Sequence, residues 1–316
     1  MLPPPPSSLS TTGAHVAAVS LGALMWHLLQ LARMTHPGLA PKSLWRAFRL
    51  FFGKMRWLPL VRSWYSDTSN PALLQMLRLR PDLICAADRP YVNATWTPRQ
   101  RLEAIQCHYR LIQGPLTFLG FAPGEQMRIG TVDIDGSGLD IVLDKPDWFV
   151  HEGEVTISLF RGELRLYSLV FLLGCQDGGR VAYIGALQGM GNAQALAIYR
   201  DLTHTLHGLR PRDLLINALR MLCAEVGIAR ILAVSDAHSM GRSSYFEREK
   251  LQTSYDVAWL DHRGMDLGDG FFELPADQAR RSNEQIPSRK RAQYRRRYEM
   301  LDALESQMGT ALKTAA

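Results

Sequence analysis

The sequence predicts an α/β (α+β) protein in which helices flank a mixed, largely antiparallel sheet, preceded by an N-terminal helical region. Three observations lead to this prediction. Residues 127–187 contain five apolar runs of period two separated by turns with Gly and Asp, which is typical of an antiparallel meander. Residues 181–236 then read strand, helix, helix, strand. The runs at 255–259 and 271–275 predict two closing strands around a polar turn.

Local signals place the helix boundaries. Thr97, followed by Pro and then by Gln100, predicts a capping box that begins a helix ending near residue 114. Within 181–236, Asn192 can cap a helix that Gly208 ends, and a second helix runs from Pro211 to Gly227. Residues 231–234 are wholly apolar, as expected of a strand covered on both faces. Helices over 242–251 and 288–312 complete the expected elements.

Three segments differ in composition. Residues 1–13 are rich in Pro and Ser and are expected to be disordered. Residues 14–69 form a basic, aromatic, amphipathic helical region, and residues 70–316 form a single α/β domain. The apolar run at 16–32 is short for a membrane span, so a helix that packs on the core or lies against a membrane is favoured over a spanning segment. The segment 42–65 has the composition of a helix in an anionic lipid interface, or of a helix covering the main domain.

Charge is unevenly distributed along the 316 residues, which carry a net charge of +6. No acidic residue precedes Asp67, and a basic block closes the chain. The candidate anionic-surface residues in that block are Arg289, Lys290, Arg291, Arg295 and Arg296. They indicate either an anionic partner or a solvated basic face. A nucleic acid is the less favoured partner, because the aromatic residues of this helix are too few for base stacking.

The cysteines predict no metal or redox motif. Cys85, Cys107, Cys175 and Cys223 are too widely spaced for a CxxC pair, and no histidine lies at ligand spacing from them. We therefore expect buried, unpaired thiols and a protein from a reducing compartment, with no metal site.

A polar cluster leaves the end of the buried strand at 231–234. Asp236 and His238 are candidate catalytic residues, because a carboxylate can orient a histidine that titrates near neutral pH, and Tyr245 is a candidate proton donor. Ser239 is a candidate ligand-binding residue. In the alternative interpretation, Asp236 and Ser239 cap the following helix and His238 is a hydrogen-bonded loop residue.

The connection between the two helices of 181–236 is a second candidate site. His207, Arg210 and Arg212 lie there, and two guanidinium groups at a helix N-terminus would suit a phosphate or a carboxylate. In the alternative interpretation, Asp213 caps its own helix and the arginines pair with neighbouring acids.

Several runs resemble the bacterial VirK/YbjX family of envelope-associated virulence proteins. They are GALQG (185–189), HGLRPRDLL (207–215), ILAVSDAHS (231–239), YDVAW (255–259), FFELP (271–275) and IPSRKRAQYRRRYEML (286–301). The resemblance implies a role in envelope maintenance, linked to surface-protein placement, lipid A remodelling and resistance to cationic antimicrobial peptides. It implies no catalytic residues, because the family has no settled chemistry.

The order of elements also resembles acyl-CoA N-acyltransferases of the GNAT type. In that family a Gly-rich turn after the fourth strand binds the pyrophosphate of the cofactor. The run GALQGMGNA is similar, which makes Gln188 and Gly189 candidate ligand-binding residues and acyl-CoA a possible cofactor. This chain departs from the pattern, because an additional helix follows residue 192 before the helix that resembles the phosphate-binding one.

We therefore expect a cytoplasmic protein, peripheral at the inner membrane, that acts on anionic lipid or a lipid-linked substrate and can be a GNAT-like acyltransferase. The alternative is a non-enzymatic adaptor that uses the same surface to place envelope proteins.

Overall fold

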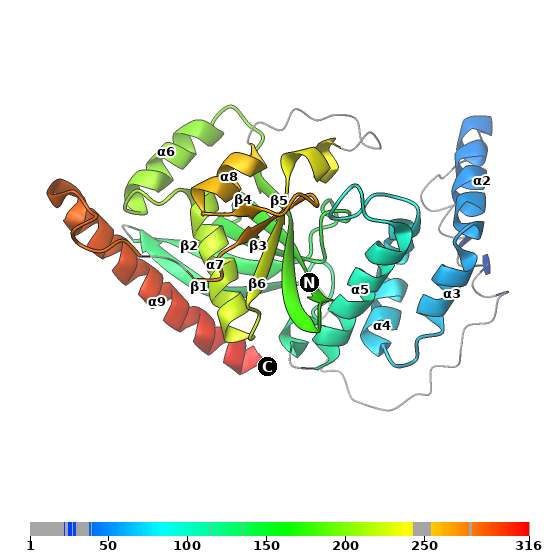
Figure 1. Cartoon of the computed structure of the whole chain (residues 1–316). Helices are drawn as coiled ribbons and strands as arrows, with labels where there is room; N and C mark the ends of the chain where they lie inside the picture. Colours follow the sequence, from blue (N-terminus) through cyan, green and yellow to red (C-terminus); the bar gives the residue numbers. More distant parts are fainter. Residues whose placement is uncertain are drawn as a thin grey trace, which may run out of the picture.

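The computed structural model describes residues 40–114, 116–134, 136–242, 254–277 and 280–315, with isolated positions between 22 and 38. Figure 1 shows the N-terminal helices gathered on one side of the molecule and the C-terminal helix running across the opposite side. The sheet lies between them. The predicted fold class, a mixed and largely antiparallel sheet with flanking helices and an N-terminal helical region, is confirmed.

Four described α-helices precede the sheet, and prolines open each of them. They are α2 (Pro41–Met55), α3 (Leu58–Tyr65), α4 (Pro71–Leu79) and α5 (Pro98–Gln113), with the 3₁₀ segment η1 (Pro81–Ala87) before α5. A proline suits the first helical turn because its missing N–H would have no intrahelical partner. The predicted capping box is present: Gln100 N–H donates to the Thr97 side chain, and the Gln100 side chain accepts from Thr97 N–H.

The predicted meander forms five consecutive antiparallel strands. These are β1 (Gln126–Ile134), β2 (Ser137–Asp144), β3 (Val155–Arg161), β4 (Leu164–Gln176) and β5 (Gly179–Gly189). The next strand, β6 (Arg230–Val234), pairs with β5 in parallel, and β8 (Phe271–Leu274) and β7 (Met265–Asp266) follow in antiparallel order. The sheet order is therefore β1-β2-β3-β4-β5-β6-β8-β7.

The remaining helices connect and cover this sheet. They are α6 (Ala195–Thr205), α7 (Pro211–Glu225), α8 (Tyr255–Asp261) and α9 (Arg291–Ala315), with short 3₁₀ segments η2 (Thr117–Leu119), η3 (Asp236–His238), η4 (Met240–Arg242) and η5 (Ser288–Lys290). The helix α7 is buried along most of its length and packs on β3, β4 and β5, as its apolar stripe predicts. In Figure 1, α6 and α8 lie beyond the same end of the sheet.

One predicted strand is wrong. The run at 255–259 forms the helix α8, because the Ser254 side chain accepts from Val257 N–H and the Asp236 carboxylate accepts from Tyr255 N–H at 2.8 Å. These two hydrogen bonds satisfy backbone N–H groups in the first turn of the helix, and they outweigh the strand propensity of Val and aromatic residues. The predicted helix at 242–251 lies almost wholly outside the described residues.

The predicted cap of α6 is also wrong. The helix begins at Ala195, after Gln194, and the Asn192 side chain instead accepts from Gln194 N–H in the preceding turn. The expected glycine exits are present, since Gly208 and Gly227 have φ values of +79° and +70°, a region that favours glycine.

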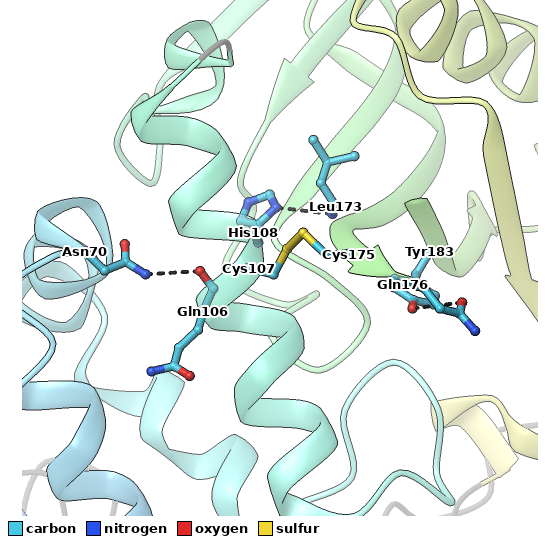
Figure 2. The surroundings of a disulfide bond; sticks show 8 residues. All are labelled: Asn70, Gln106, Cys107, His108, Leu173, Cys175, Gln176 and Tyr183. Atoms are coloured by element: carbon cyan, nitrogen blue, oxygen red, sulfur yellow. Dashed lines mark hydrogen bonds between the residues drawn. A yellow bond between two sulfur atoms is a disulfide. The ribbon is translucent and has the colours of Figure 1, made fainter. Parts of the chain in front are cut away.

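The prediction of unpaired thiols is wrong for two of the four cysteines. Cys107 of α5 and Cys175 of β4 form a disulfide, whereas Cys85 and Cys223 are free and buried. Figure 2 shows why the two sulfur atoms meet: α5 packs on β4, where Nδ1 of the neighbouring His108 accepts from Leu173 N–H. This pairing joins positions 68 residues apart through a tertiary contact that spacing along the chain does not reveal.

Within the part of the chain that the structure describes, no helix is long and apolar enough to cross a membrane.

Candidate functional site

The strands β5 and β6 diverge at the end of the sheet that carries the predicted site. They pair only over residues 181–184 and 230–233, although β5 continues to Gly189. The divergence begins at Gly185, an additional residue in β5 that shifts its register against β4. A Cβ atom at this position would lie 1.8 Å from the carbonyl oxygen of Glu152, so the bend requires glycine.

A cavity of about 990 Å³ opens where the strands diverge. Its wall consists of residues 185–193 of β5 and the following loop, one side of α6, the start of α7 at 210–212, and residues contributed by η4 and α8. The volume lies at the upper end of the range of about 300–1,000 Å³ typical of small-molecule sites. Apolar side chains, among them Phe149, Leu196 and Met240, alternate with a few polar groups.

Tyrosine hydroxyls hold the cavity wall in place. The hydroxyl of Tyr255, the first residue of α8, accepts from Leu187 N–H at 3.3 Å. The hydroxyl of Tyr199 on α6 accepts from Met190 N–H and donates to the carbonyl oxygen of Leu166 at 2.9 Å. Burial raises the pKa of the Tyr255 hydroxyl well above its ordinary value, so it stays protonated at neutral pH.

Glu152, in the loop before β3, is the one acidic residue on the described wall of this cavity, and its carboxylate accepts from His151 N–H at 3.2 Å. Its charge also contributes to the raised pKa of Tyr255. A carboxylate and a protonated tyrosine on one cavity wall are a possible general base and general acid.

The predicted arginine pair lies at the cavity, and its partners are acids of this chain. Arg210 Nε donates to Asp213 at 2.7 Å, while Arg210 and Arg212 both donate to Asp261, at 2.9 and 2.8 Å. The alternative interpretation, that these arginines pair with neighbouring acids, is therefore confirmed. The same interpretation also had Asp213 cap its own helix, and this part is wrong, because the Asp213 carboxylate accepts from Arg210 and contacts His262 and does not cap α7. Arg200 of α6 is a third, exposed arginine at the cavity.

Gln188 and Gly189 line the cavity together with Arg210 and Arg212, whereas the predicted site residues His207, Asp236, His238 and Ser239 do not. His207 lies in the left-handed region at the turn before α7, where its carbonyl oxygen accepts from Arg297. Burial lowers the pKa of His207, and the charges of Arg296 and Arg297 lower it further.

The predicted catalytic cluster lies in η3, outside the cavity wall. The Asp236 carboxylate accepts from Tyr255 N–H and from the Ser254 hydroxyl, and Ser239 Oγ donates to the Asp236 carbonyl oxygen. His238 Nδ1 lies 2.8 Å from Ser235 Oγ. These hydrogen bonds make Asp236 a cap of α8, whereas the helix that it was predicted to cap, at 242–251, lies almost wholly outside the described residues. The catalytic role of this cluster stays a prediction.

Tyr245 lies outside the described residues. Sequence reasoning missed Tyr255, Tyr199 and Glu152. The signal for Tyr255 was present, because Ser254 is a good N-cap residue and places a tyrosine at the first turn of a helix.

The basic block is exposed along η5 and the first turns of α9. Its residues are Arg289, Lys290, Arg291, Arg295 and Arg296. Arg291 donates to two backbone carbonyls, and Arg295 lies 3.8 Å from Glu299. Binding of an anionic surface by these side chains stays a prediction. The described residues contain no group of three His, Cys, Asp or Glu side chains placed to hold a metal ion.

Comparison with known proteins places the chain in a family. The family model "Protein of unknown function (DUF535)" matches residues 40–310. The uncharacterized protein YbjX of Escherichia coli is 32% identical over 288 residues, which is 86% of each chain. The chain belongs to this family, the VirK/YbjX family. An uncharacterized protein of Haemophilus influenzae is 32% identical over 126 residues, 38% of this chain and 40% of its own.

A more distant relative is named "Membrane protein LapB", from Mannheimia haemolytica. It is 23% identical over 171 residues, which is 53% of this chain and 72% of the relative. No solved structure matches the chain, so the GNAT-like order of elements stays a prediction.

Proposed function

We propose that this VirK/YbjX protein is an acyltransferase of the bacterial envelope that binds an acyl thioester, such as acyl-CoA, in the cavity beside β5. The observation that carries the proposal is the divergence of β5 from β6 after Ile184, which opens the cavity along an extended backbone that has no β6 partner.

An extended backbone can pair with the amide groups of a ligand as a neighbouring strand would. The pantetheine arm of coenzyme A carries two such amides. The apolar side chains of Phe149, Leu196 and Met240 suit the acyl chain. Arg200 and the N-terminal residues of α7 also line the cavity, and a helix N-terminus favours phosphate groups.

Two groups on the wall suit the chemistry of acyl transfer. The oxygen or nitrogen of the acceptor attacks the thioester carbonyl carbon and loses its proton to Glu152. The new C–O or C–N bond replaces the C–S bond, and Tyr255 gives its hydroxyl proton to the leaving thiolate. A proton then passes from Glu152 to Tyr255 through solvent and restores both groups. Since Leu187 N–H donates to the Tyr255 oxygen, the hydroxyl hydrogen can point to the ligand.

Attachment to a membrane is the second part of the proposal. The helix α2 exposes Trp45 (62%), Phe48 (51%) and Phe52 (52%), whose rings lie in contact along one side of the helix. Exposed aromatic residues on a helix without acidic residues suit an anionic lipid interface. The name of the LapB relative supports this location, as does the basic surface of α9.

Thermal unfolding with added ligand tests the donor site. Palmitoyl-CoA should raise the melting temperature, because a ligand at 100 times its dissociation constant stabilises the fold by about 2.7 kcal/mol. Ala193→Trp should abolish the shift, since Ala193 lines the cavity and an indole would fill it. The matched control is Ala197→Trp, on an exposed position of α6 away from the cavity.

If neither coenzyme A nor palmitoyl-CoA changes the melting temperature, the proposed donor site is refuted. The alternative function, a non-enzymatic adaptor whose surface helps to place envelope proteins, would then be favoured.

A further inference from the structure

A second, smaller cavity of about 190 Å³ adjoins the cavity of about 990 Å³ beside β5, which we call the donor cavity. The two share a wall made by Phe149, Tyr167 and the end of β5 at 188–190. Gly189 allows this wall to be thin, because a Cβ atom there would lie 2.4 Å from the Tyr199 hydroxyl and 2.8 Å from the Tyr167 ring. A group bound in the small cavity therefore lies next to a ligand in the large one.

Buried polar groups lie beneath the smaller cavity. The guanidinium of Arg165 donates to both oxygens of the buried Asp144 carboxylate and to the hydroxyls of Ser158 and Ser168. Ser158 Oγ also donates to Asp144 at 3.1 Å. The strand register places Ser158 opposite Ser168, and Ser168 opposite Gln188, so these side chains lie on one face of the sheet.

An aromatic residue, Trp148, also lines the smaller cavity. Trp148 lies in the loop after β2, is 58% exposed, and packs against the Arg165 guanidinium at 5.2 Å from the ring centroid. A second ring, that of Phe160, also packs on this guanidinium, with its centroid 4.6 Å from the Arg165 Cζ atom. The indole is held in position by this contact and still presents most of its surface to solvent.

The charge of the cavity excludes one class of ligand. Among the described residues that line it, Arg165 is the only charged one, and the buried Asp144 carboxylate neutralises this guanidinium. An anion such as phosphate would compete with Asp144 for Arg165. A neutral ligand that both donates and accepts hydrogen bonds fits the polar residues that line the cavity: the Gln188 amide can donate and accept, Arg165 donates, and the Ser168 oxygen, which already accepts from Arg165 and bonds to Ser158, can accept one more bond.

We propose that the smaller cavity is the acceptor subsite and that it binds a sugar ring. The apolar face of the ring would stack on Trp148, while its hydroxyls would bond to Ser168, Gln188 and Arg165. This inference rests on the proposed function for its role, because the shared wall puts a ring hydroxyl beside the thioester. The bond formed is then an ester C–O bond, with the protons moving through Glu152 and Tyr255 as above.

Binding of monosaccharides measured by saturation-transfer NMR tests this subsite. Glucose, glucosamine and N-acetylglucosamine should bind with millimolar dissociation constants, and open-chain sorbitol, which has no ring face, should not. Trp148→Ala should weaken binding by at least about tenfold, whereas Trp148→Phe should retain it within about threefold. Gln188→Leu should weaken it at nearly constant side-chain volume.

The matched control is Trp45→Ala, which removes an equally exposed tryptophan on α2 and should leave sugar binding unchanged. Palmitoyl-CoA should still raise the melting temperature of Trp148→Ala, which separates the two ligand sites. If no sugar ring binds, if binding survives Trp148→Ala, or if inorganic phosphate binds in place of the sugars, the acceptor subsite is refuted. A failure of palmitoyl-CoA alone would refute the donor site and leave the sugar site standing.

Discussion

Single residues decide the geometry of the donor cavity. Gly185 is the position at which β5 leaves β6, because its missing Cβ allows the Glu152 carbonyl to approach. Tyr255 then fixes the diverging backbone through Leu187 N–H. The same tyrosine is the proton donor in the proposed reaction, so its structural and chemical contributions must be separated by experiment.

Tyr255→Phe should slow acyl transfer far more than it weakens binding. Loss of a general acid lowers turnover by about 10²–10⁴-fold, while leaving Leu187 N–H unsatisfied destabilises the fold by about 1–3 kcal/mol. Release of free thiol from palmitoyl-CoA, with isolated membranes as the source of acceptor, measures turnover. Tyr183→Phe, which changes a buried tyrosine outside the cavity, is the control. Equal turnover in both variants would remove Tyr255 from the mechanism.

Asp213 makes the stability of the fold depend on pH. Burial raises the pKa of its carboxyl, but the hydrogen bond and charge of His262 and the pairing with Arg210 lower it more, so the net pKa is below its ordinary value. A lowered carboxyl pKa contributes stability above about pH 4, which is lost as the pH falls through the folded-state pKa.

Asp213→Asn should therefore lower the free energy of unfolding by about 1–3 kcal/mol at pH 7, and by less as the pH falls below about 4. Urea unfolding at both pH values measures the difference, with the exposed Asp147→Asn as control. If Asp213→Asn lowers the free energy of unfolding equally at pH 7 and pH 3, the stabilising role of the ionised Asp213 carboxylate is contradicted.

At the scale of elements, local patterns predict most of the fold. The meander and α5 follow from alternation and from a capping box, which are properties of neighbouring residues. The strand predicted at 255–259 is wrong because this run forms a helix that depends on the Asp236 carboxylate, which reaches Tyr255 N–H from another segment. The disulfide between α5 and β4 was not predicted for the same reason: it too joins distant segments. Contacts between elements distant in sequence are not encoded in a local pattern.

The helix α2 should attach the protein to anionic membranes. Replacing Trp45, Phe48 and Phe52 together by Ser should weaken sedimentation with phosphatidylglycerol vesicles by at least about tenfold, since each fully buried aromatic contributes about 1.5–3 kcal/mol. Binding by the unmodified protein should weaken as salt is added. The control replaces Val257 and Leu260, two exposed apolar residues of α8, by Ser. Equal loss in both variants would show that α2 is no specific anchor.

At the scale of the whole molecule, the disulfide ties the N-terminal helices to the sheet. It closes a loop across a sequence separation of 68, for which the chain-entropy estimate is about 4 kcal/mol. Reduction should lower the free energy of unfolding by about 2–4 kcal/mol. Two thiols should react with an alkylating reagent in the denatured, oxidised protein, and four after reduction. Four reactive thiols before reduction would refute the disulfide.

This bond also bears on location. Disulfides persist in oxidising compartments and are rare in the cytosol. The cytoplasmic location, predicted from cysteine spacing, therefore stays a prediction, and alkylation in acid-quenched cells would test it.

The candidate site was predictable only in part. Gln188 lies at the end of β5, and Arg210 and Arg212 lie at the start of α7; local signals identify both boundaries, and all three residues line the cavity. His238 also follows the end of a strand, but it does not line the cavity, because η3 turns its side chain toward Ser235 and Gly270. Glu152 and Phe149 come from a loop that reaches the cavity only because β5 bends at Gly185. That bend depends on packing across the sheet, which no single segment specifies.

A crystal structure of the protein with bound coenzyme A tests the central claim most directly. We expect the pantetheine arm to lie along residues 185–189, with its amides paired to the β5 backbone and its thiol next to Tyr255. Coenzyme A bound elsewhere, for example on the basic turns of α9 with the cavity beside β5 left without ligand, would contradict the account.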